Sequence, residues 1–166
     1  EQPLACDDLV DHALLQEELA TPLCLDETIC SFNVARAALQ LGSCRIINIK
    51  PGRVGGLLQS ILIHNYCHDR GIPVWCGGML ETGIGRAHNV ALASLPSFSL
   101  PHDISASNRY WAQDIIEPEF TLNKDGTISV PRGAGIGVEV LEERLEEATI
   151  EVRRFKGSRF TSSNRS

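Results

Sequence analysis

Short apolar runs that end in a polar residue recur along the first hundred residues, and segments with helical periodicity separate them. The apolar runs cover residues 22–26, 45–50, 73–76 and 98–103. Continuous apolar runs of this length are typical of buried parallel strands. The helical segments cover residues 9–19, 32–41, 57–67 and 86–95, and Gly42 and Gly71 stand where two of them are expected to stop. The pattern predicts an α/β protein built from repeated strand–helix units.

The even spacing of these units predicts a barrel. The residues at the strand ends fall at positions 1, 26, 50, 76 and 103, at intervals of 25, 24, 26 and 27. Such regularity is typical of a βα-barrel. An open doubly wound sheet is the competing fold, but its glycine fingerprint is missing from residues 1–4. Eight units at this spacing need roughly 200 residues, so we expect half a barrel here.

The repeat stops after Trp111, where a different pattern begins. Asp125 and Gly126 stand between two β-rich runs, which predicts a hairpin. A glycine-rich loop, a helix over 141–148 and a strand over 149–155 are expected to follow. We therefore predict a partial barrel over 1–111, a separate C-terminal segment over 112–155 and a disordered tail over 156–166.

Charge and cysteine usage narrow the function classes. The net charge is -6 and the pI is near 5.3, which argues against a nucleic-acid-binding protein. Six irregularly spaced cysteines without a C-x-x-C pair are typical of reduced thiols, so we expect a cytoplasmic protein. No apolar stretch is long enough to cross a membrane. The first residue is Glu1 rather than Met, and we expect the chain to be cut from a longer one.

Three strand-end side chains carry candidate chemistry. In a barrel, Glu1, Asp26 and Lys50 would point into one site from three successive strands. Two carboxylates on neighbouring strands suit a hard cation such as Mg²⁺, which prefers oxygen ligands. A nearby amine can accept a proton beside a carboxylate while the cation holds the charge that develops. The alternative is that these residues form ordinary surface ion pairs at the loop mouths.

Four segments make the likeness to a known family specific. They are Glu1–Leu4, Cys24–Glu27, Asn48–Gly56 and the stretch PVWCGGMLETGIGR at 73–86. Together they resemble the o-succinylbenzoate synthase and N-acylamino acid racemase branch of the enolase superfamily, in its muconate-lactonizing-enzyme subgroup. The likeness runs to about Phe155. It implies the C-terminal half of an enolase-type (β/α)7β barrel, followed by a segment that returns to the capping lobe.

The resemblance assigns roles to the strand-end residues. Glu1 and Asp26 match the second and third metal ligands of the family, and Lys50 matches the catalytic lysine on its sixth strand. The implied cofactor is Mg²⁺, with Mn²⁺ as the other divalent ion to consider. By the resemblance, the third carboxylate and the Lys-x-Lys pair of the family are expected to precede Glu1, in an N-terminal half outside this sequence. We therefore expect the isolated chain to be inactive. The complete protein is expected to be a homo-oligomer.

The resemblance also implies a substrate site at the last two strand ends. The implied substrate-binding residues are Gly77, Gly78, Met79, Glu81, Asp103, Ser105 and Ser107. A double glycine lets backbone approach a ligand closely, and the alternative is a tight turn into the next helix. Tyr110 and Trp111 fit either a lid over the pocket or packing beneath it.

A small-molecule carboxylate is the implied substrate. The expected activity is Mg²⁺-dependent dehydration that yields 2-succinylbenzoate in menaquinone biosynthesis, with N-acylamino acid racemisation at the same site. A dipeptide epimerase or muconate cycloisomerase relative is the second enzyme hypothesis. A non-catalytic half-barrel interaction module is the third.

Two further signals are interpreted as structural. His64 and His68 stand four apart on an expected helix, but no catalytic glutamate follows the first histidine, so we expect a solvated helix face. The glycine clusters at 83–85 and 133–137 lack the flanks of a nucleotide-binding loop and are predicted to be turns.

Overall fold

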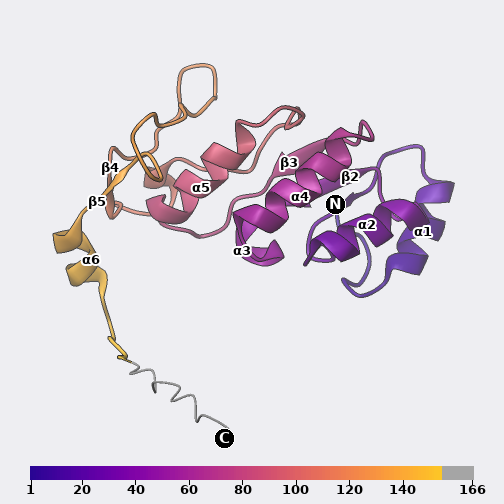
Figure 1. The fold of residues 1–166 in the computed structure, drawn as a ribbon, viewed down its shortest axis with the longest axis horizontal. Coiled ribbons are helices and arrows are strands. Elements are labelled where there is room, and N and C mark those ends of the chain that lie inside the picture. The colour runs from indigo at the N-terminus through magenta and orange to yellow at the C-terminus, as the bar shows by residue number, and fades with distance from the viewer. Residues whose placement is uncertain (155–166) are drawn as a thin grey trace, which may run out of the picture.

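The computed structural model describes residues 1–154, and its first half consists mainly of alternating helices and strands (Figure 1). The helices are α1 (Leu9–Glu18), α2 (Phe32–Leu41), α3 (Pro51–Val54), α4 (Leu57–His68), α5 (Gly83–Ala93) and α6 (Glu142–Ala148). The strands are β1 (Cys24–Leu25), β2 (Ile46–Ile49), β3 (Val74–Cys76), β4 (Ile116–Glu117) and β5 (Glu139–Val140), and Ser107–Arg109 forms a 3-10 helix. The predicted repeat of strand and helix is confirmed.

Helix α2 shows why the predicted boundaries hold. The Ser31 side chain accepts a hydrogen bond from the backbone N–H of Val34, which satisfies a free donor of the first turn. Gly42 ends the helix with φ 78°, a left-handed conformation that glycine adopts without steric cost. Gly71, with φ 63°, follows α4 in the same way.

Strands β1, β2 and β3 form a parallel sheet in chain order. Leu25 pairs with Ile47, and Ile47 pairs in turn with Val74. The helices between the strands also contact one another in chain order, α1 with α2, α2 with α4 and α4 with α5 (Figure 1). This is the arrangement of consecutive βα units in a barrel wall.

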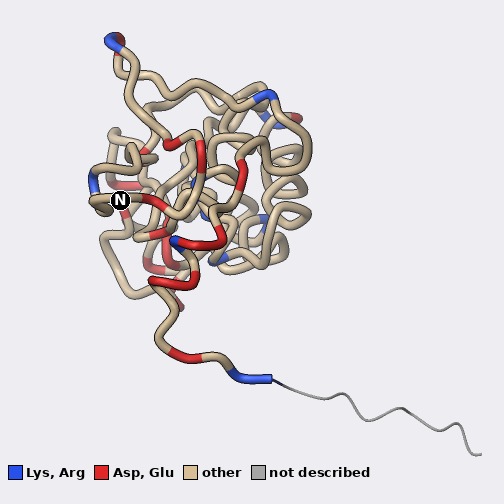
Figure 2. The backbone as a smooth tube through the Cα atoms, turned by 90° about the vertical axis from the view of Figure 1, so that its left-hand side faces the viewer, with Lys and Arg blue, Asp and Glu red and all other residues tan. Residues whose placement is uncertain are grey.

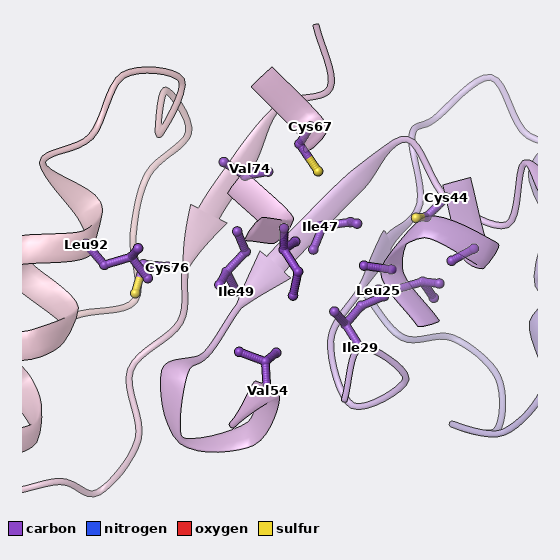
Figure 3. Close-up of a cluster of buried hydrophobic side chains, with 13 residues drawn as sticks. Leu25, Ile29, Cys44, Ile47, Ile49, Val54, Cys67, Val74, Cys76 and Leu92 are labelled. Atoms are coloured by element: carbon purple, nitrogen blue, oxygen red, sulfur yellow. The ribbon is translucent and has the colours of Figure 1, made fainter. Parts of the chain in front are cut away.

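The main core lies between this sheet and the helices (Figure 3). Leu25, Ile47, Ile49 and Val74 are each completely buried in it. Because side chains of a strand alternate between the two faces, residues 24, 26, 48 and 50 belong to the opposite face of the sheet. The alternation that puts apolar side chains into the core therefore places the polar strand-end residues on the opposite face of the sheet.

The expected strand over 98–103 is the first correction. Only two isolated parallel bridges form there, Phe98 with Val74 and Asp103 with Gly77. Five residue steps on this segment oppose three on its neighbour, so the ladder is interrupted. Pro101 also has no N–H to donate to a ladder.

The C-terminal segment confirms part of its prediction. The hairpin forms around Gly126, with one antiparallel bridge between Leu122 and Ile128, and α6 lies where a helix was expected. The expected strand after it is wrong for residues 149–154, which have no regular structure. Ile150 is fully exposed there, so this apolar pattern is not packed against a neighbour.

Three remaining expectations concern the glycines, the tail and the domain boundary. Gly83 and Gly85 lie in the first turn of α5 rather than in a turn between elements, whereas 133–137 forms turns and bends as predicted. The predicted disordered tail lies outside the described residues, and the boundary after residue 111 stays a prediction.

Figure 2 shows acidic positions gathered around α6, which carries Glu142, Glu143, Glu146 and Glu147. Within residues 1–154, every helix is too short or too polar to cross a membrane.

Candidate active site

Lys50 and Asp26 meet at the carboxyl ends of neighbouring strands. Lys50 follows β2 and Asp26 follows β1, and the Lys50 Nζ lies 2.9 Å from Asp26 Oδ2. Both side chains are largely buried, with exposed fractions of 15% and 7%. Partial removal from water strengthens the attraction between the two charges relative to a surface pair. The structure thus brings together two of the three residues that the sequence placed at one site.

Arg53 is a second cation on Asp26, and the sequence reasoning missed it. It lies in α3, the short helix that starts at Pro51, and its guanidinium contacts the other carboxylate oxygen of Asp26. Its remaining N–H groups donate to the backbone oxygens of Asn48 at 2.6 Å and Ile29 at 2.8 Å. The signal was present, because proline at a first helical position predicts a turn that carries Arg53 back toward the strand end.

Asn48 connects Glu1 to this group. Asn48 is completely buried in β2, and its Nδ2 donates to Glu1 Oε1 at 3.1 Å. Its own Oδ1 is buried without a hydrogen-bond partner among residues 1–154. Asn48 was also missed, although it is the one polar residue within the apolar run of β2. A buried amide in such a run needs a polar partner, and that partner here is a candidate metal ligand.

Gln2 fixes the position of Glu1 beside β1. The backbone N–H of Gln2 donates to Cys24 O at 2.9 Å, and its side-chain oxygen accepts from the backbone N–H of Asp26 at 3.0 Å. Glu1 itself is exposed. The chain start is therefore aligned with the strand ends, and Glu1, Asp26 and Lys50 lie along the same edge of the sheet.

The donor atoms at this edge fit a hard divalent cation as part of a larger ligand set. Glu1 and Asp26 offer carboxylate oxygens, and the unpartnered Asn48 Oδ1 is a further hard oxygen nearby. The described residues contain no group of three His, Cys, Asp or Glu side chains that could hold a metal ion alone. The chemistry of the donors suits Mg²⁺ or Mn²⁺, and further ligands are needed to complete the site.

A cavity of about 430 Å³ opens beside Lys50. Its walls come from α3, the start of α4, the loop after β3 and helix α5. It is lined by Lys50, Pro51, Gly52, Gly55, Gly56, Leu57, Gly77, Met79, Glu81, Gly85, His88 and Asn89. Three of the expected substrate-binding residues, Gly77, Met79 and Glu81, therefore share one cavity with the lysine.

Glu81 brings a half-buried carboxylate to this cavity. Burial raises the pKa of the Glu81 carboxyl above its ordinary value, while hydrogen bonds and the charge of Arg86 act in the opposite direction. The carboxylate accepts hydrogen bonds from the backbone N–H of Met79 at 2.6 Å and from Asn89 Nδ2 at 3.2 Å. Glu81 is therefore held in one orientation.

The double glycine is required by close approach. A Cβ on Gly78 would lie 2.2 Å from the backbone oxygen of Asp103, which accepts a hydrogen bond from the Gly78 N–H at 2.9 Å. Asp103 is exposed and Ser105 is half-buried, with its hydroxyl 3.4 Å from Tyr110 Oη. Neither Asp103 nor Ser105 lines the cavity beside Lys50.

Ser107 lies away from the cavity, in a buried polar cluster. It is completely buried, and its hydroxyl donates to Asp114 Oδ2 at 2.7 Å and accepts from the backbone N–H of Phe120 at 3.2 Å. A hydroxyl committed in this way does not suit direct substrate contact, so we leave Ser107 out of the substrate site. Trp111 donates to the Glu81 backbone oxygen at 3.1 Å, which places it against the cavity loop.

The two helical histidines correct a further expectation. His68 is exposed as expected, but His64 is only 4% exposed, and its ring lies between those of His68 and Phe98 at centroid distances of 5.9 Å and 5.3 Å. His64 also hydrogen-bonds the backbone oxygen of Pro96. Its role is to join α4 to the loop before the last barrel segment.

The fold and this edge together define the class of protein. A parallel sheet covered by helices, with an acid, a lysine and a cavity at the carboxyl ends of its strands, has the arrangement of the face on which βα-barrel enzymes carry their active sites. The chain belongs to the enolase C-terminal domain-like family, which matches residues 1–144. Enzymes of the enolase superfamily combine a lysine or histidine base with Mg²⁺.

Individual relatives agree with this assignment. The chain is 59% identical over 149 residues to o-succinylbenzoate synthase of Geobacillus kaustophilus, covering 90% of this chain and 40% of that protein. It is 50% identical over 158 residues to N-succinylamino acid racemase of Thermus thermophilus, covering 95% and 42%. A solved enolase-superfamily structure from Listeria innocua matches with a TM-score of 0.84 at 51% identity, over 88% of this chain and 39% of that one.

These matches confirm the resemblance and the α/β barrel fold. The chain spans about two fifths of the length of the relatives that it matches. The closely similar proteins carry two different activity names, a synthase and a racemase.

Proposed function

We propose that this chain carries the strand-end part of the active site of an o-succinylbenzoate synthase that also racemises N-acylamino acids. The observation that carries the proposal is Lys50, held 2.9 Å from Asp26 at the mouth of the cavity that Glu81 and Gly77 line. The relatives at 50–59% identity support this choice of activities.

The proposed main reaction converts 2-succinyl-6-hydroxy-2,4-cyclohexadiene-1-carboxylate to 2-succinylbenzoate, a step of menaquinone biosynthesis. The hydrogen beside the carboxylate leaves as a proton, the neighbouring ring C–O bond breaks, and the products are an aromatic ring and water. Glu1 and Asp26 would hold Mg²⁺ or Mn²⁺ together with ligands from the rest of the protein. When bound, the cation would supply positive charge that stabilises the negative charge developing on the substrate carboxylate as the proton leaves.

Lys50 has a distinct task in each activity. In the dehydration, its ammonium group stabilises the negative charge that develops on the substrate carboxylate, because it lies in a partly buried site. In racemisation, the Lys50 Nζ takes or returns the proton on one face of the alpha carbon. The base for the other face would come from the N-terminal half of the protein.

Arg53 and Asn48 prepare this site rather than react. Arg53 shares Asp26 with Lys50, so the Asp26 carboxylate is fixed from two sides. Asn48 orients Glu1 through its Nδ2. Fixed neighbours reduce the reorganisation that the reaction requires.

The more distant relatives support the alternatives less well. A chloromuconate cycloisomerase is 26% identical, and the solved structure of an L-Ala-D/L-Glu epimerase from Bacillus subtilis is 27% identical with a TM-score of 0.75. A non-catalytic interaction module has no specific observation in its favour.

The free thiols of all six cysteines support a cytoplasmic location, since disulfides are rare there.

The decisive experiment assays the complete protein with both substrates, with Mg²⁺ or Mn²⁺ present and after its removal. We expect turnover of the cyclohexadiene carboxylate and slower racemisation of N-succinylamino acids. Lys50→Ala should lower racemisation by a factor of about 10² to 10⁴, the usual range for a proton-transfer group. It should lower the dehydration by about 10² to 10³, the usual range for one group that stabilises developing charge. Lys124→Ala, at an exposed turn, is the matched control and should leave both rates unchanged. Turnover of neither substrate by the wild-type protein would reject the proposal.

A further inference from the structure

Loop 79–82, which contributes Met79 and Glu81 to the cavity, is hydrogen-bonded by two residues that do not line the cavity. The backbone oxygen of Glu81 accepts two hydrogen bonds, from Arg86 Nη2 at 3.2 Å and from Trp111 Nε1 at 3.1 Å. Neither Arg86 nor Trp111 lines the cavity. Both donors therefore hold the loop through its backbone, and neither is part of the cavity wall.

Arg86 belongs to a completely buried ion pair with Asp114. The two side chains have no exposed surface, and Arg86 Nη1 lies 3.1 Å from Asp114 Oδ2. Asp114 Oδ1 accepts a hydrogen bond at 2.8 Å from the backbone N–H of Gly83, the first residue of α5. The planar guanidinium fork thus joins Asp114 through one nitrogen and the Glu81 loop through the other.

Gly83 allows Asp114 and its neighbour to approach so closely. A Cβ on Gly83 would lie 2.3 Å from Ile116 Cδ1 and 2.9 Å from Asp114 Oδ2. The C-terminal segment therefore lies directly against the start of α5. Loop 79–82 is therefore held at two points: Arg86 binds Glu81 within the loop, and Asp114 binds Gly83 directly after it.

Stability alone does not account for this arrangement. Burying two charges costs desolvation energy that a well-packed apolar pair would avoid. Arg86 Nε is in addition buried without a hydrogen-bond partner among residues 1–154. What an apolar pair could not provide is the directed bond from the guanidinium to the Glu81 backbone.

We propose that Arg86 and Asp114 are positioning residues that hold loop 79–82, and with it Glu81, at a fixed place in the wall of the cavity beside Lys50. They set substrate affinity and the preference between the two substrates without contacting either one. This inference rests on the proposed function for its kinetic part, whereas the ordering of the loop is independent of any activity.

The test uses the complete protein with Arg86→Met, Arg86→Lys and Trp111→Phe. Hydrogen-exchange mass spectrometry follows the backbone amides of 79–83, and kinetics give KM and kcat for each substrate. In Arg86→Met, we expect exchange at 79–83 to rise at least about tenfold, KM to rise on the order of tenfold or more and kcat to change less, because misplaced binding groups weaken capture of substrate. Arg86→Lys should recover the ion pair but only part of the loop ordering.

Two matched variants keep the test decisive. Trp111→Phe removes the other bond to Glu81 from a surface position, so it tests the loop even if Arg86→Met does not fold. Arg70→Met removes an exposed arginine that lies over Tyr66 on α4, and it should change neither exchange at 79–83 nor KM.

The outcomes separate the two proposals. Inactive wild-type protein with a loosened loop in Arg86→Met would reject the proposed function and support the positioning role of Arg86 and Asp114. Unchanged exchange at 79–83 and unchanged KM in both Arg86→Lys and Trp111→Phe would overturn the positioning role, even if Arg86→Met were unstable.

Discussion

Gly77 faces Lys50 so closely that no larger residue fits between them. A Cβ on Gly77 would lie 2.4 Å from Lys50 Cε and 2.6 Å from Asn48 Oδ1. Lys50 is the first residue after β2, and Gly77 is the first residue after β3. The missing side chain is thus what lets the lysine lie at the cavity mouth.

Gly77→Ala is therefore expected to displace Lys50 from Asp26. Turnover of the complete protein should fall about 10²-fold, because an ångström of misplacement has effects of that size. Gly71→Ala is the control, since Gly71 does not line the cavity and a Cβ there would meet nothing within 4 Å. Steady-state kinetics on both variants measure the effect, and equal activity of the two would contradict this account of Gly77.

Asn48→Ala should separate metal binding from stability. The substitution removes the bond to Glu1, but it also removes an unpartnered buried oxygen. Each of these effects is about 1 kcal/mol and they oppose each other, so the free energy of unfolding should change little. Affinity for Mn²⁺, measured by calorimetry on the complete protein, should fall because Glu1 loses its orientation.

Asn123→Ala, in the exposed hairpin, serves as the control for Asn48→Ala and should leave Mn²⁺ affinity unchanged. A normal Mn²⁺ affinity in Asn48→Ala would show that Asn48 does not orient a metal ligand.

Thiol labelling of the native protein should distinguish the cysteines by burial. Cys6 and Cys30 are exposed, whereas the other four are buried. Burial raises the pKa of Cys24 to about 11 and the pKa values of Cys44, Cys67 and Cys76 to about 12, so the reactive thiolate is scarce at these four positions. Iodoacetamide at pH 8 should modify Cys6 and Cys30 first, as peptide mass spectrometry would reveal. Rapid labelling of Cys67 in folded protein would contradict the packing of the core.

The same thiols should make the protein sensitive to alkaline pH. Burial raises the pKa of Cys67 from 9.0 to about 12, so the unfolded chain releases this proton at lower pH than the folded protein does. Stability from the neutral thiol is complete below about pH 9 and is lost as pH rises toward 12. Denaturation at several pH values should show a slope that Cys67→Ala reduces by up to about 1.4 kcal/mol per pH unit.

The exposed residue Cys6 provides the comparison for this pH series. Cys6→Ala should leave the slope of unfolding free energy against pH as it is in the wild-type protein. A slope in Cys67→Ala that equals the wild-type slope would contradict the assignment of this effect to the buried thiol.

The sequence predicted elements well where one local signal decided the structure. Ser31 and Gly42 define both ends of α2, and the apolar run before Lys50 defines β2. The segment with Phe98 and Asp103 failed because a bulge and a proline interrupt pairing, and strand pairing depends on a neighbour that a local pattern does not contain.

The candidate site divides in the same way. Residues at the strand ends, such as Asp26 and Lys50, follow from the period of the repeat. Asp114 does not, because it is far in sequence from Arg86 and its role arises only when the C-terminal segment packs against α5. His64 was misjudged for a similar reason, since its burial comes from Phe98 rather than from its own helix.

The ion pair between Arg86 and Asp114 also has a consequence for how this protein could change its substrate preference. It joins the C-terminal segment to the loop that lines the cavity, so under the proposed positioning role a mutation near Asp114 would alter substrate choice through the loop backbone. Evolution can in this way alter which molecule is accepted while the acid, the amine and their geometry stay intact. A barrel with such a remote adjustment point is well suited to hosting two chemistries on one scaffold.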